Sequence, residues 1–484
     1  MLTKIKMGAR MNKILKTMVM LFAALIACWM PAFAQKDAPL PKGLPAYGPE
    51  KPLQAPDVRI SKLANGLTLW LVPRPGFPKT AFSLSLRGGL AADPATLPGI
   101  SELLMRTIDQ GTKTRTARQI AEEFQGTGGD LQGFAGKDAA VLSVGVLSSR
   151  IEPALAVLAD VVQNASFPEA EVAVAKKQLA DTLRLREGSP SFLASRAMAR
   201  VLFGDSPYHV VGATQNVVDT ATRQDLQRIY AQRFRPDQAI FLAVGDFDEA
   251  SMRRLVEQKF GQWKAPSESP AAEAAVPENP PAHDVYVVQR PGSVQTTLQF
   301  GAFGPRRSDP DYEAAQVADA IYGGQFTSRL TMNIREDKGY TYSPFSSLSA
   351  YRAAGTMITH ADVRNAVTGA TVNEIAYELN RMVTTSPTET ELANAKRNIV
   401  GTEALRLQYR VAVARELAGL WILGLPPEEI GAEGKKVTET TAADVDAAAK
   451  KYFPASRMAI VAVGEESVVK EALAPFGLTV QPVP

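Results

Sequence analysis

Two stretches of this sequence hold residue types whose spacing could serve chemistry. In residues 98–112 (PGISELLMRTIDQGT), Glu102, Met105 and Arg106 follow one another at i, i+3 and i+4. The proline at the start and the glycine near the end of this segment are typical of helix boundaries, so the three residues are expected on one helix. A catalytic zinc ion needs three protein ligands and a water molecule, and a methionine cannot accept a proton. One carboxylate beside an arginine therefore predicts an i,i+4 ion pair rather than a metal site.

The second stretch holds Arg335 and Tyr342, seven residues apart. A guanidinium is a permanently charged forked donor, and a phenol is a second donor that stays neutral at pH 7. Two donors aimed at one carbonyl oxygen form an oxyanion-hole-like arrangement. Gly339 is expected to turn the backbone from a helix that ends near Lys338 into a strand that bears Tyr342. The alternative is structural, with Arg335 complementing the helix dipole and Tyr342 half-buried in the strand.

The elements that position these residues are predicted to be mixed helices and strands. β-Branched or alternating runs predict strands, and longer amphipathic stretches between them predict helices. In the first half of the chain the predicted strands are residues 68–72, 82–86, 140–146 and 240–244, and the predicted helices are residues 116–125, 150–164, 169–186, 191–203 and 222–233. Strands followed by helix pairs indicate an antiparallel-rich sheet covered by helices on one face.

The second half of the chain repeats the first. Residues 230–245 (YAQRFRPDQAIFLAVG) match residues 449–464 (AKKYFPASRMAIVAVG), and two further pairs of segments match at nearly the same offset. We predict an extended segment over residues 35–56, one domain over residues 57–265, a proline-rich linker over residues 266–282 and a second domain over residues 283–484. A duplicated α+β unit leaves a natural binding cavity between its halves.

The first 34 residues are predicted to be a targeting segment. Basic residues precede an apolar run that is too short to span a membrane comfortably, and residues 31–34 (PAFA) offer a small-x-small cleavage site after Ala34. The alternative is a lipobox, residues 25–28 (LIAC), which makes Cys28 a lipid anchor. In both cases export is expected, to a bacterial periplasm or beyond the cell.

Composition excludes several classes of function. One cysteine rules out an internal disulfide framework and thiolate metal sites, and three histidines (His209, His283, His360) show no metal-motif spacing. No partner of matching type is expected near His360 in sequence. Removal of the five basic residues of the leader from 53 basic and 50 acidic residues leaves a net charge near −2. This near-neutral charge gives no electrostatic reason to expect nucleic acid as a partner.

Residues 98–112 resemble the zinc-motif segment of the pitrilysin/insulinase-like metallopeptidase family, which includes the mitochondrial processing peptidase subunits. Members carry H-x-x-E-H inside a P-G-x-x-H-x-x-E-H…G-T frame, with two zinc-binding histidines and a glutamate that activates water. Here the frame is kept, but the histidine positions hold Glu102 and Arg106 and the glutamate position holds Met105. The family's third ligand aligns with Thr182, one residue beyond Asp181.

Residues 322–343 resemble the family's stretch of Gly-Gly, S-R-L and R-E-x-x-G-x-x-Y-S with little deviation. In family members the arginine and tyrosine of this motif lie across the cavity from the zinc ion. They are thought to hold the peptide and to help polarise the scissile carbonyl. By this match, the corresponding pair here is Arg335 and Tyr342.

The resemblance implies an α+β fold of two homologous domains, each a mainly antiparallel sheet covered by helices, that form a clamshell half-chamber. Exported bacterial members commonly pair a zinc-motif chain with a chain that lacks the motif but keeps the arginine and tyrosine. We therefore expect a non-catalytic subunit of a heterodimeric zinc metallopeptidase that binds no metal itself, with zinc in the partner subunit and a peptide as substrate. The alternatives are a non-enzymatic scaffold or peptide-binding protein and, third, an autonomous peptidase with unrecognised ligands.

Overall fold

The computed structural model describes residues 43, 55–270, 274–276 and 285–483. The predicted leader with Ala34 and Cys28, nearly all of the extended segment and much of the linker lie outside these residues, as does His283. Among the described residues, no helix combines the length and the apolar character that crossing a membrane requires.

The first half folds into a six-stranded sheet with the strand order β1-β2-β6-β3-β5-β4. Only β2 and β6 pair in parallel, and the other neighbours are antiparallel. The strands are β1 (Arg59–Lys62), β2 (Thr68–Pro73), β3 (Lys79–Arg87), β4 (Leu131–Ala135), β5 (Ala139–Leu147) and β6 (Ala239–Gly245). The helices are α2 (Ile100–Thr107), α3 (Ala117–Gly126), α4 (Ile151–Asn164), α5 (Glu169–Glu187), α6 (Pro190–Phe203), α7 (Gln215–Thr220), α8 (Arg223–Arg233) and α9 (Glu249–Phe260).

The second half has a six-stranded sheet with the order β12-β7-β11-β8-β10-β9, which repeats the order of the first sheet except at the β1 and β12 edges. Its strands are β7 (Val285–Gln289), β8 (Gln295–Gly304), β9 (Phe345–Ala350), β10 (Gly355–Arg364), β11 (Ala459–Gly464) and β12 (Val480–Pro482). Its helices are α10 (Tyr312–Asp319), the π-helix η5 (Ala320–Gly324), α11 (Arg329–Thr331), the π-helix η6 (Met332–Asp337), α12 (Thr368–Thr384), α13 (Glu389–Arg406), α14 (Arg410–Leu423), α15 (Glu429–Glu439), α16 (Ala442–Tyr452) and α17 (Glu466–Leu473). The predicted α+β class and duplication are confirmed.

Each predicted strand and helix of the first half is present, and all except the helix of residues 98–112 have ends that differ by three residues or fewer. The helix expected over residues 98–112 is shorter, because α2 ends at Thr107. The Thr107 hydroxyl donates back to the carbonyl oxygens of Leu103 and Leu104, at 2.8 and 3.1 Å, which satisfies acceptors of the last turn. At the other end, Gly99 has φ +88°, and a Cβ there would lie 2.3 Å from the Gly212 carbonyl oxygen, so only glycine fits.

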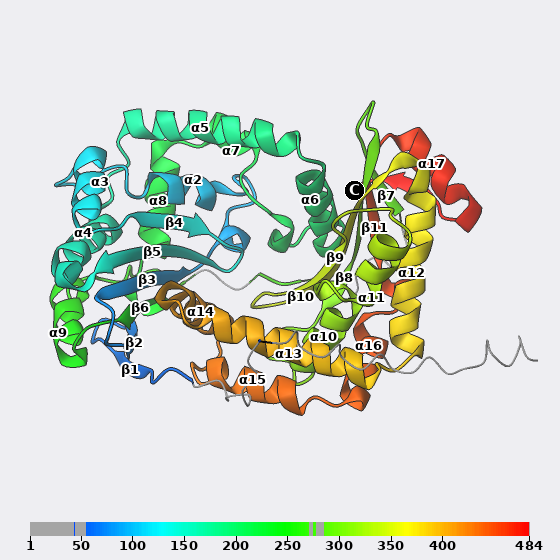
Figure 1. Ribbon diagram of the computed structural model, residues 1–484. Helices are drawn as coiled ribbons and strands as arrows, with labels where there is room; N and C mark the ends of the chain where they lie inside the picture. The colour runs from blue at the N-terminus through cyan, green and yellow to red at the C-terminus, as the bar shows by residue number, and fades with distance from the viewer. Residues whose placement is uncertain (1–42, 44–54, 271–273, 277–284, 484) are drawn as a thin grey trace, which may run out of the picture. The chain divides into compact units, whose positions relative to one another are not determined.

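The two halves exchange one helix each. Helix α6 of the first half packs on β8 and β11 of the second sheet, whereas α14 of the second half packs on β3 and β6 of the first sheet (Figure 1). The two helices have 14 residues each and occupy equivalent places in the repeat. The prediction of helices on one face only was therefore incomplete. Strands β6 and β11 are buried along their whole length because both faces of each sheet are covered there.

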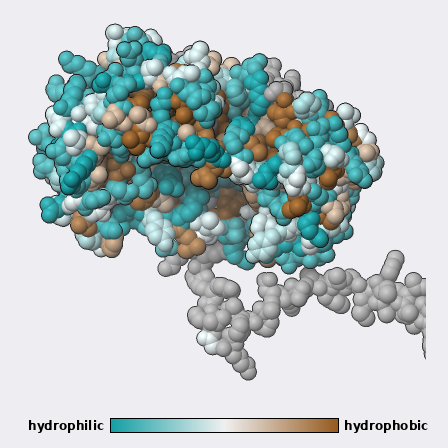
Figure 2. All heavy atoms as spheres, turned by 90° about the horizontal axis from the view of Figure 1, so that it is seen from above, coloured by the Kyte–Doolittle hydropathy of each residue, from teal (hydrophilic) through white to brown (hydrophobic). Residues whose placement is uncertain are grey.

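The core has four parts, in keeping with this exchange. Two large clusters lie between each sheet and the helices of its own half. Two smaller clusters lie under the exchanged helices: Met198 and Leu202 of α6 pack with Val461, and Leu417 of α14 packs with Leu242. Seen from above, the surface is mostly hydrophilic, with apolar residues in separate groups and a hollow near the middle of this face (Figure 2).

The exchanged helix α14 offers a test of its contribution to stability. Leu417 is fully buried against the first sheet, so Leu417→Ala is expected to lower the free energy of unfolding by ~2–5 kcal/mol through lost burial and a cavity. Val411 lies on the same helix and is exposed, so Val411→Ala should change that free energy by less than about 0.5 kcal/mol. Urea unfolding followed by circular dichroism measures both values, and equal effects of the two substitutions would contradict the packing described.

Candidate functional site

Glu102 on α2 is the centre of a polar cluster that joins α2 to α5 and to the loop before α7. Its carboxylate accepts two hydrogen bonds from Arg186 on α5, each 2.9 Å long, and one from the Ala213 N–H at 2.9 Å. Arg106, one turn along α2, donates to the same carboxylate at 3.1 Å. Burial raises the pKa of Glu102, but the hydrogen bonds from Arg186 and Ala213 outweigh this effect and leave the pKa below its ordinary value. Glu102 is therefore an ionised cross-link between two helices.

The structure brings positions 102, 106 and 182 together. The Arg106 Nη2 atom lies 3.5 Å from the Thr182 Oγ1 atom on α5. Asp181 lies on another side of that helix and pairs with Arg184 at 2.8 Å. Thus Thr182, and not Asp181, faces the cluster.

The i,i+4 ion pair predicted for Glu102 and Arg106 is present, but it is part of a larger and mostly buried cluster, because the Glu102 side chain is only 16% exposed and also bonds Arg186. The sequence analysis did not identify Arg186, although it follows Thr182 by four residues on a helix and therefore shares its face. Met105 does not belong to this polar cluster. It is 4% exposed, belongs to the first core cluster, and approaches the Gly133 backbone of β4 so closely that a Cβ there would lie 3.1 Å from its Sδ-bound methyl carbon.

Arg335 lies on η6 between two aromatic rings. Its guanidinium carbon is 4.5 Å from the ring centroid of Tyr342 and 4.8 Å from that of Phe326, which are cation–π distances. Its Nε atom lies 3.0 Å from a Glu336 carboxylate oxygen. Within the described part of the chain, its two terminal nitrogens have no hydrogen-bond acceptor. The stacked guanidinium is therefore held in place, and its two terminal nitrogens remain available as hydrogen-bond donors.

Tyr342 lies in a loop, residues 338–344, and not in the predicted strand. Gly339 ends η6 with φ +63°, and its N–H donates to the Arg335 carbonyl oxygen at 3.1 Å, as expected for a left-handed helix end. Pairing with β10 begins only at Phe345, because Pro344 has no N–H to donate to the ladder. Tyr342 is 78% exposed, which also excludes the half-buried alternative.

Arg335, Tyr342 and the loop between them line a cavity of about 560 Å³. Gln295 on β8 and two residues of β10, Asp362 and Arg364, complete its wall. His360, two residues before Asp362, places its Nε2 atom 3.1 Å from the Asp362 carboxylate and stacks on Phe345. The expectation that His360 has no partner nearby in sequence was therefore wrong, because residues two apart on a strand share a face.

Comparisons with known proteins identify the family to which this chain belongs. Residues 74–193 match the model of insulinase, peptidase family M16, and residues 220–399 match the model of the peptidase M16 inactive domain. The chain belongs to peptidase family M16. The region that matches the inactive domain contains Arg335 and Tyr342.

Relatives of this M16 chain cover most of its length. An uncharacterized zinc protease of Rickettsia bellii is 27% identical over 83% of this chain and 96% of the relative, and one of Mycobacterium tuberculosis is 25% identical over 75% and 84%. A crystal structure of a peptidase M16 inactive domain from Pseudomonas fluorescens has a TM-score of 0.78 and 26% identity, and covers 84% of this chain and 98% of that one. A protease from Helicobacter pylori, 18% identical, shares the fold with a TM-score of 0.78 over 85% and 100% of the two chains.

The donor set of this M16 chain does not fit zinc at the motif helix. Zinc is bound by carboxylate, imidazole or thiolate ligands, and a catalytic site takes three of them. The three positions together hold one carboxylate that is already bound by two arginines, one guanidinium, which is a donor without an acceptor atom, and one hydroxyl. Among the described residues, no three side chains of histidine, cysteine, aspartate or glutamate lie close enough together to hold a metal ion.

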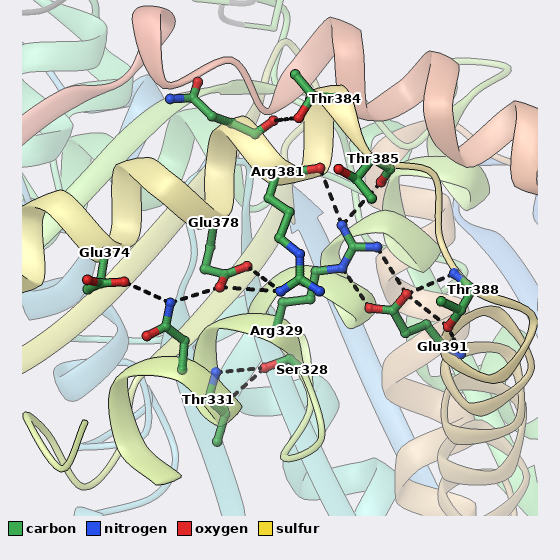
Figure 3. A network of polar contacts seen from close by, with 12 residues as sticks. Ser328, Arg329, Thr331, Glu374, Glu378, Arg381, Thr384, Thr385, Thr388 and Glu391 are labelled. Carbon is green, nitrogen blue, oxygen red and sulfur yellow. Dashed lines mark hydrogen bonds and ion pairs between the residues drawn. The ribbon is translucent and has the colours of Figure 1, made fainter. Parts of the chain in front are cut away.

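The S-R-L motif of this M16 chain anchors the segment that carries Arg335. Arg329 is buried and makes two bonds to Glu391 at the start of α13, 2.7 and 3.0 Å long. It also donates to backbone carbonyl oxygens at the end of α12, including that of Thr385 at 3.2 Å (Figure 3). Asn333 on η6 adds bonds to Glu374 and Glu378 of α12, at 3.0 and 2.8 Å. The motif therefore fixes η6 on the side away from the cavity.

Glu102 permits a test of the polar cluster in the first half. Glu102→Ala leaves Arg186 and Arg106 without their carboxylate in a partly buried place, so we expect a loss of about 2–3 kcal/mol in the free energy of unfolding. Asp181→Ala removes an acid from an exposed pair on the neighbouring helix and should cost less than about 0.5 kcal/mol. Urea titrations at low and high salt measure both, and a Glu102→Ala effect as small as that of the control would refute the cross-link.

Glu391 gives a prediction about pH. Burial raises the pKa of Glu391, but hydrogen bonds from Arg329 and Thr388 lower it to about 2. Because the pKa in the folded state lies below that in the unfolded state, this stabilisation is present above pH ~4.5 and is lost as the pH falls towards 2. Glu391→Gln should therefore reduce the free energy of unfolding by on the order of 2–3 kcal/mol at pH 7, and the difference from wild type should shrink below pH 4.

Urea unfolding at pH 7, 5, 4 and 3 measures this difference. Glu389→Gln, an exposed position in the same helical turn, is the matched control and should stay close to wild type throughout. A Glu391→Gln deficit that is independent of pH would mean that the carboxylate does not titrate as described.

Proposed function

We propose that this chain is the non-catalytic subunit of an exported heteromeric zinc peptidase. In this proposal it completes the chamber of a homologous partner that binds zinc, and it contributes Arg335 and Tyr342 to the peptide-binding site. The observation that carries the proposal is the contrast between the two motifs. The helix with Glu102 holds one carboxylate that is already bound by two arginines, whereas the two terminal nitrogens of Arg335 have no acceptor among the described residues.

The burial of the two sites supports this division of roles. The Glu102 carboxylate accepts hydrogen bonds from Arg186, Arg106 and a backbone N–H, so its oxygens are already engaged and are not offered to a metal ion. At the other site, the ring of Tyr342 is largely exposed and lies over the Arg335 guanidinium. A half-buried guanidinium and an exposed phenol on the wall of a cavity suit the backbone carbonyl groups of an extended peptide.

The role that follows for the two residues is positioning and polarisation. Arg335 and Tyr342 would donate hydrogen bonds to carbonyl oxygens of a peptide, and the chemistry would belong to the metal site of the partner. Because of the predicted leader segment, we also propose that the chain is exported to the periplasm and that its mature form begins after Ala34. The mass of the mature protein tests this, since the alternative is a chain that begins at Cys28 and carries a lipid anchor.

Co-expression with a zinc-motif homologue from the same genome tests the function. We expect a stable complex that cleaves a fluorogenic peptide, and the double variant Arg335→Ala/Tyr342→Phe should lose ~10²–10³-fold in kcat/KM because donors to the reacting carbonyl are removed. Both side chains lie at the surface of the cavity, so thermal unfolding should change little.

The matched control is Arg118→Ala/Tyr409→Phe. Both residues are exposed, and both are distant in sequence from the residues that line the cavity. It should leave kcat/KM unchanged. Absence of any complex, or full activity of the Arg335/Tyr342 double variant, would instead favour the alternative of a non-enzymatic scaffold or peptide-binding protein.

A further inference from the structure

The cavity beside Arg335 contains a second arginine. Arg364 is the last residue of β10 and lies opposite Gln295 of β8 in the sheet. Its side chain shares the face of β10 that carries Asp362, because alternate residues of a strand point the same way. It is exposed and lines the same cavity as Arg335 and Tyr342. In the described residues no carboxylate or carbonyl group lies within hydrogen-bond distance of its guanidinium.

The acids of this cavity already have partners. Glu336 lies 3.0 Å from the Nε atom of Arg335. Asp362 accepts from the Thr297 hydroxyl and lies 3.1 Å from the His360 ring. Hydrogen bonding to His360 lowers the pKa of Asp362, so this carboxylate is ionised and already paired with His360 and Thr297. No ion pair joins either acid to Arg364.

The remaining polar side chains on the wall are hydroxyls and one amide, which can donate as well as accept hydrogen bonds. The hydroxyls of Tyr340, Thr341, Tyr342 and Ser343 and the amide of Gln295 have no side-chain partner among the described residues. A cavity with two guanidinium groups that keep free donors, surrounded by hydroxyls, suits a ligand that is rich in acceptors. A carboxylate meets a guanidinium fork with two parallel charge-assisted hydrogen bonds, which a neutral carbonyl group cannot do.

We propose that Arg364 and Arg335 together bind a carboxylate of the peptide in this cavity, either its C-terminal carboxylate or an acidic side chain. This inference rests on the peptide-binding function proposed above and names the class of peptide that the site selects. Arg364 then determines specificity, whereas Arg335 and Tyr342 also bind peptides that carry no negative charge.

Fluorescence anisotropy with the complex of this chain and its zinc-motif homologue, with the metal removed to prevent cleavage, tests the proposal. Three labelled peptides of one neutral sequence are compared: one amidated, one with a free C-terminus, and one amidated with a single glutamate. We expect at least one of the two carboxylate peptides to bind about tenfold more tightly than the neutral one, and the preference to weaken with salt. The peptide that shows the preference identifies the source of the carboxylate.

Arg364→Gln should abolish the preference without weakening the binding of the neutral amidated peptide, and Arg364→Lys should restore only part of it. Arg118→Gln, on the exposed face of α3, is the control and should keep the full preference. Because Arg364 is exposed, thermal unfolding of the variant should match wild type.

Equal binding of all three peptides to wild type, or a preference that survives Arg364→Gln, overturns this inference and leaves the proposed function standing. Failure of every peptide to bind overturns both. Loss of neutral-peptide binding in Arg364→Gln, with the fold intact, overturns the assignment of Arg364 to specificity alone.

Discussion

The exchange of one helix between the two halves is the interaction on which the rest of the structure depends. A sheet that is covered on one face only would expose the apolar residues of its central strands to water. Here α6 covers the second sheet and α14 covers the first, so each half completes the core of the other. Because neither half can bury its sheet alone, the two domains hold a fixed relation, and the loops that leave the sheets, including the loop with Tyr342, inherit it.

Within this fold the two motif regions differ in what their polar side chains bind. In the first half, Glu102 joins α2 to α5 through Arg186 in a mostly buried polar cluster. Its carboxylate oxygens are engaged by hydrogen bonds and are not offered to a metal ion. In the second half, Arg329 and Asn333 anchor η6 from behind, so that the stacked Arg335 presents its donors to a cavity. Buried Arg329 and half-buried Arg335 belong to one motif, but the first anchors the segment and the second lines the cavity.

Much of the fold could be predicted from the sequence. The periods of apolar residues located β2, β3, β5, β6 and most helices of the first half, but not β1, β4, α7 or α9. The repeated segments indicated two like sheets, and Gly339 marked the end of a helix. Predictions failed where a contact between distant segments decided the outcome. Arg186 was missed because its importance arises from Glu102, 84 residues away. Tyr342 was assigned to a strand because propensity does not reveal that pairing with β10 starts only after Pro344.

The sequence by itself determined the class of fold and its duplication, because these follow from local periodicity and from repeated segments. It also determined that positions 102, 105, 106 and 182 offer a single carboxylate, which is fewer ligands than a catalytic zinc ion takes. Only the tertiary structure decided which sheet each exchanged helix covers, that Met105 is a core residue, and that Arg364 shares a cavity with Arg335. The reason is that an amphipathic helix specifies how much apolar surface it must bury but not against which sheet. Likewise, Arg335 and Arg364, 29 positions apart, line one cavity only when the helix η6 and the strand β10 are folded close together.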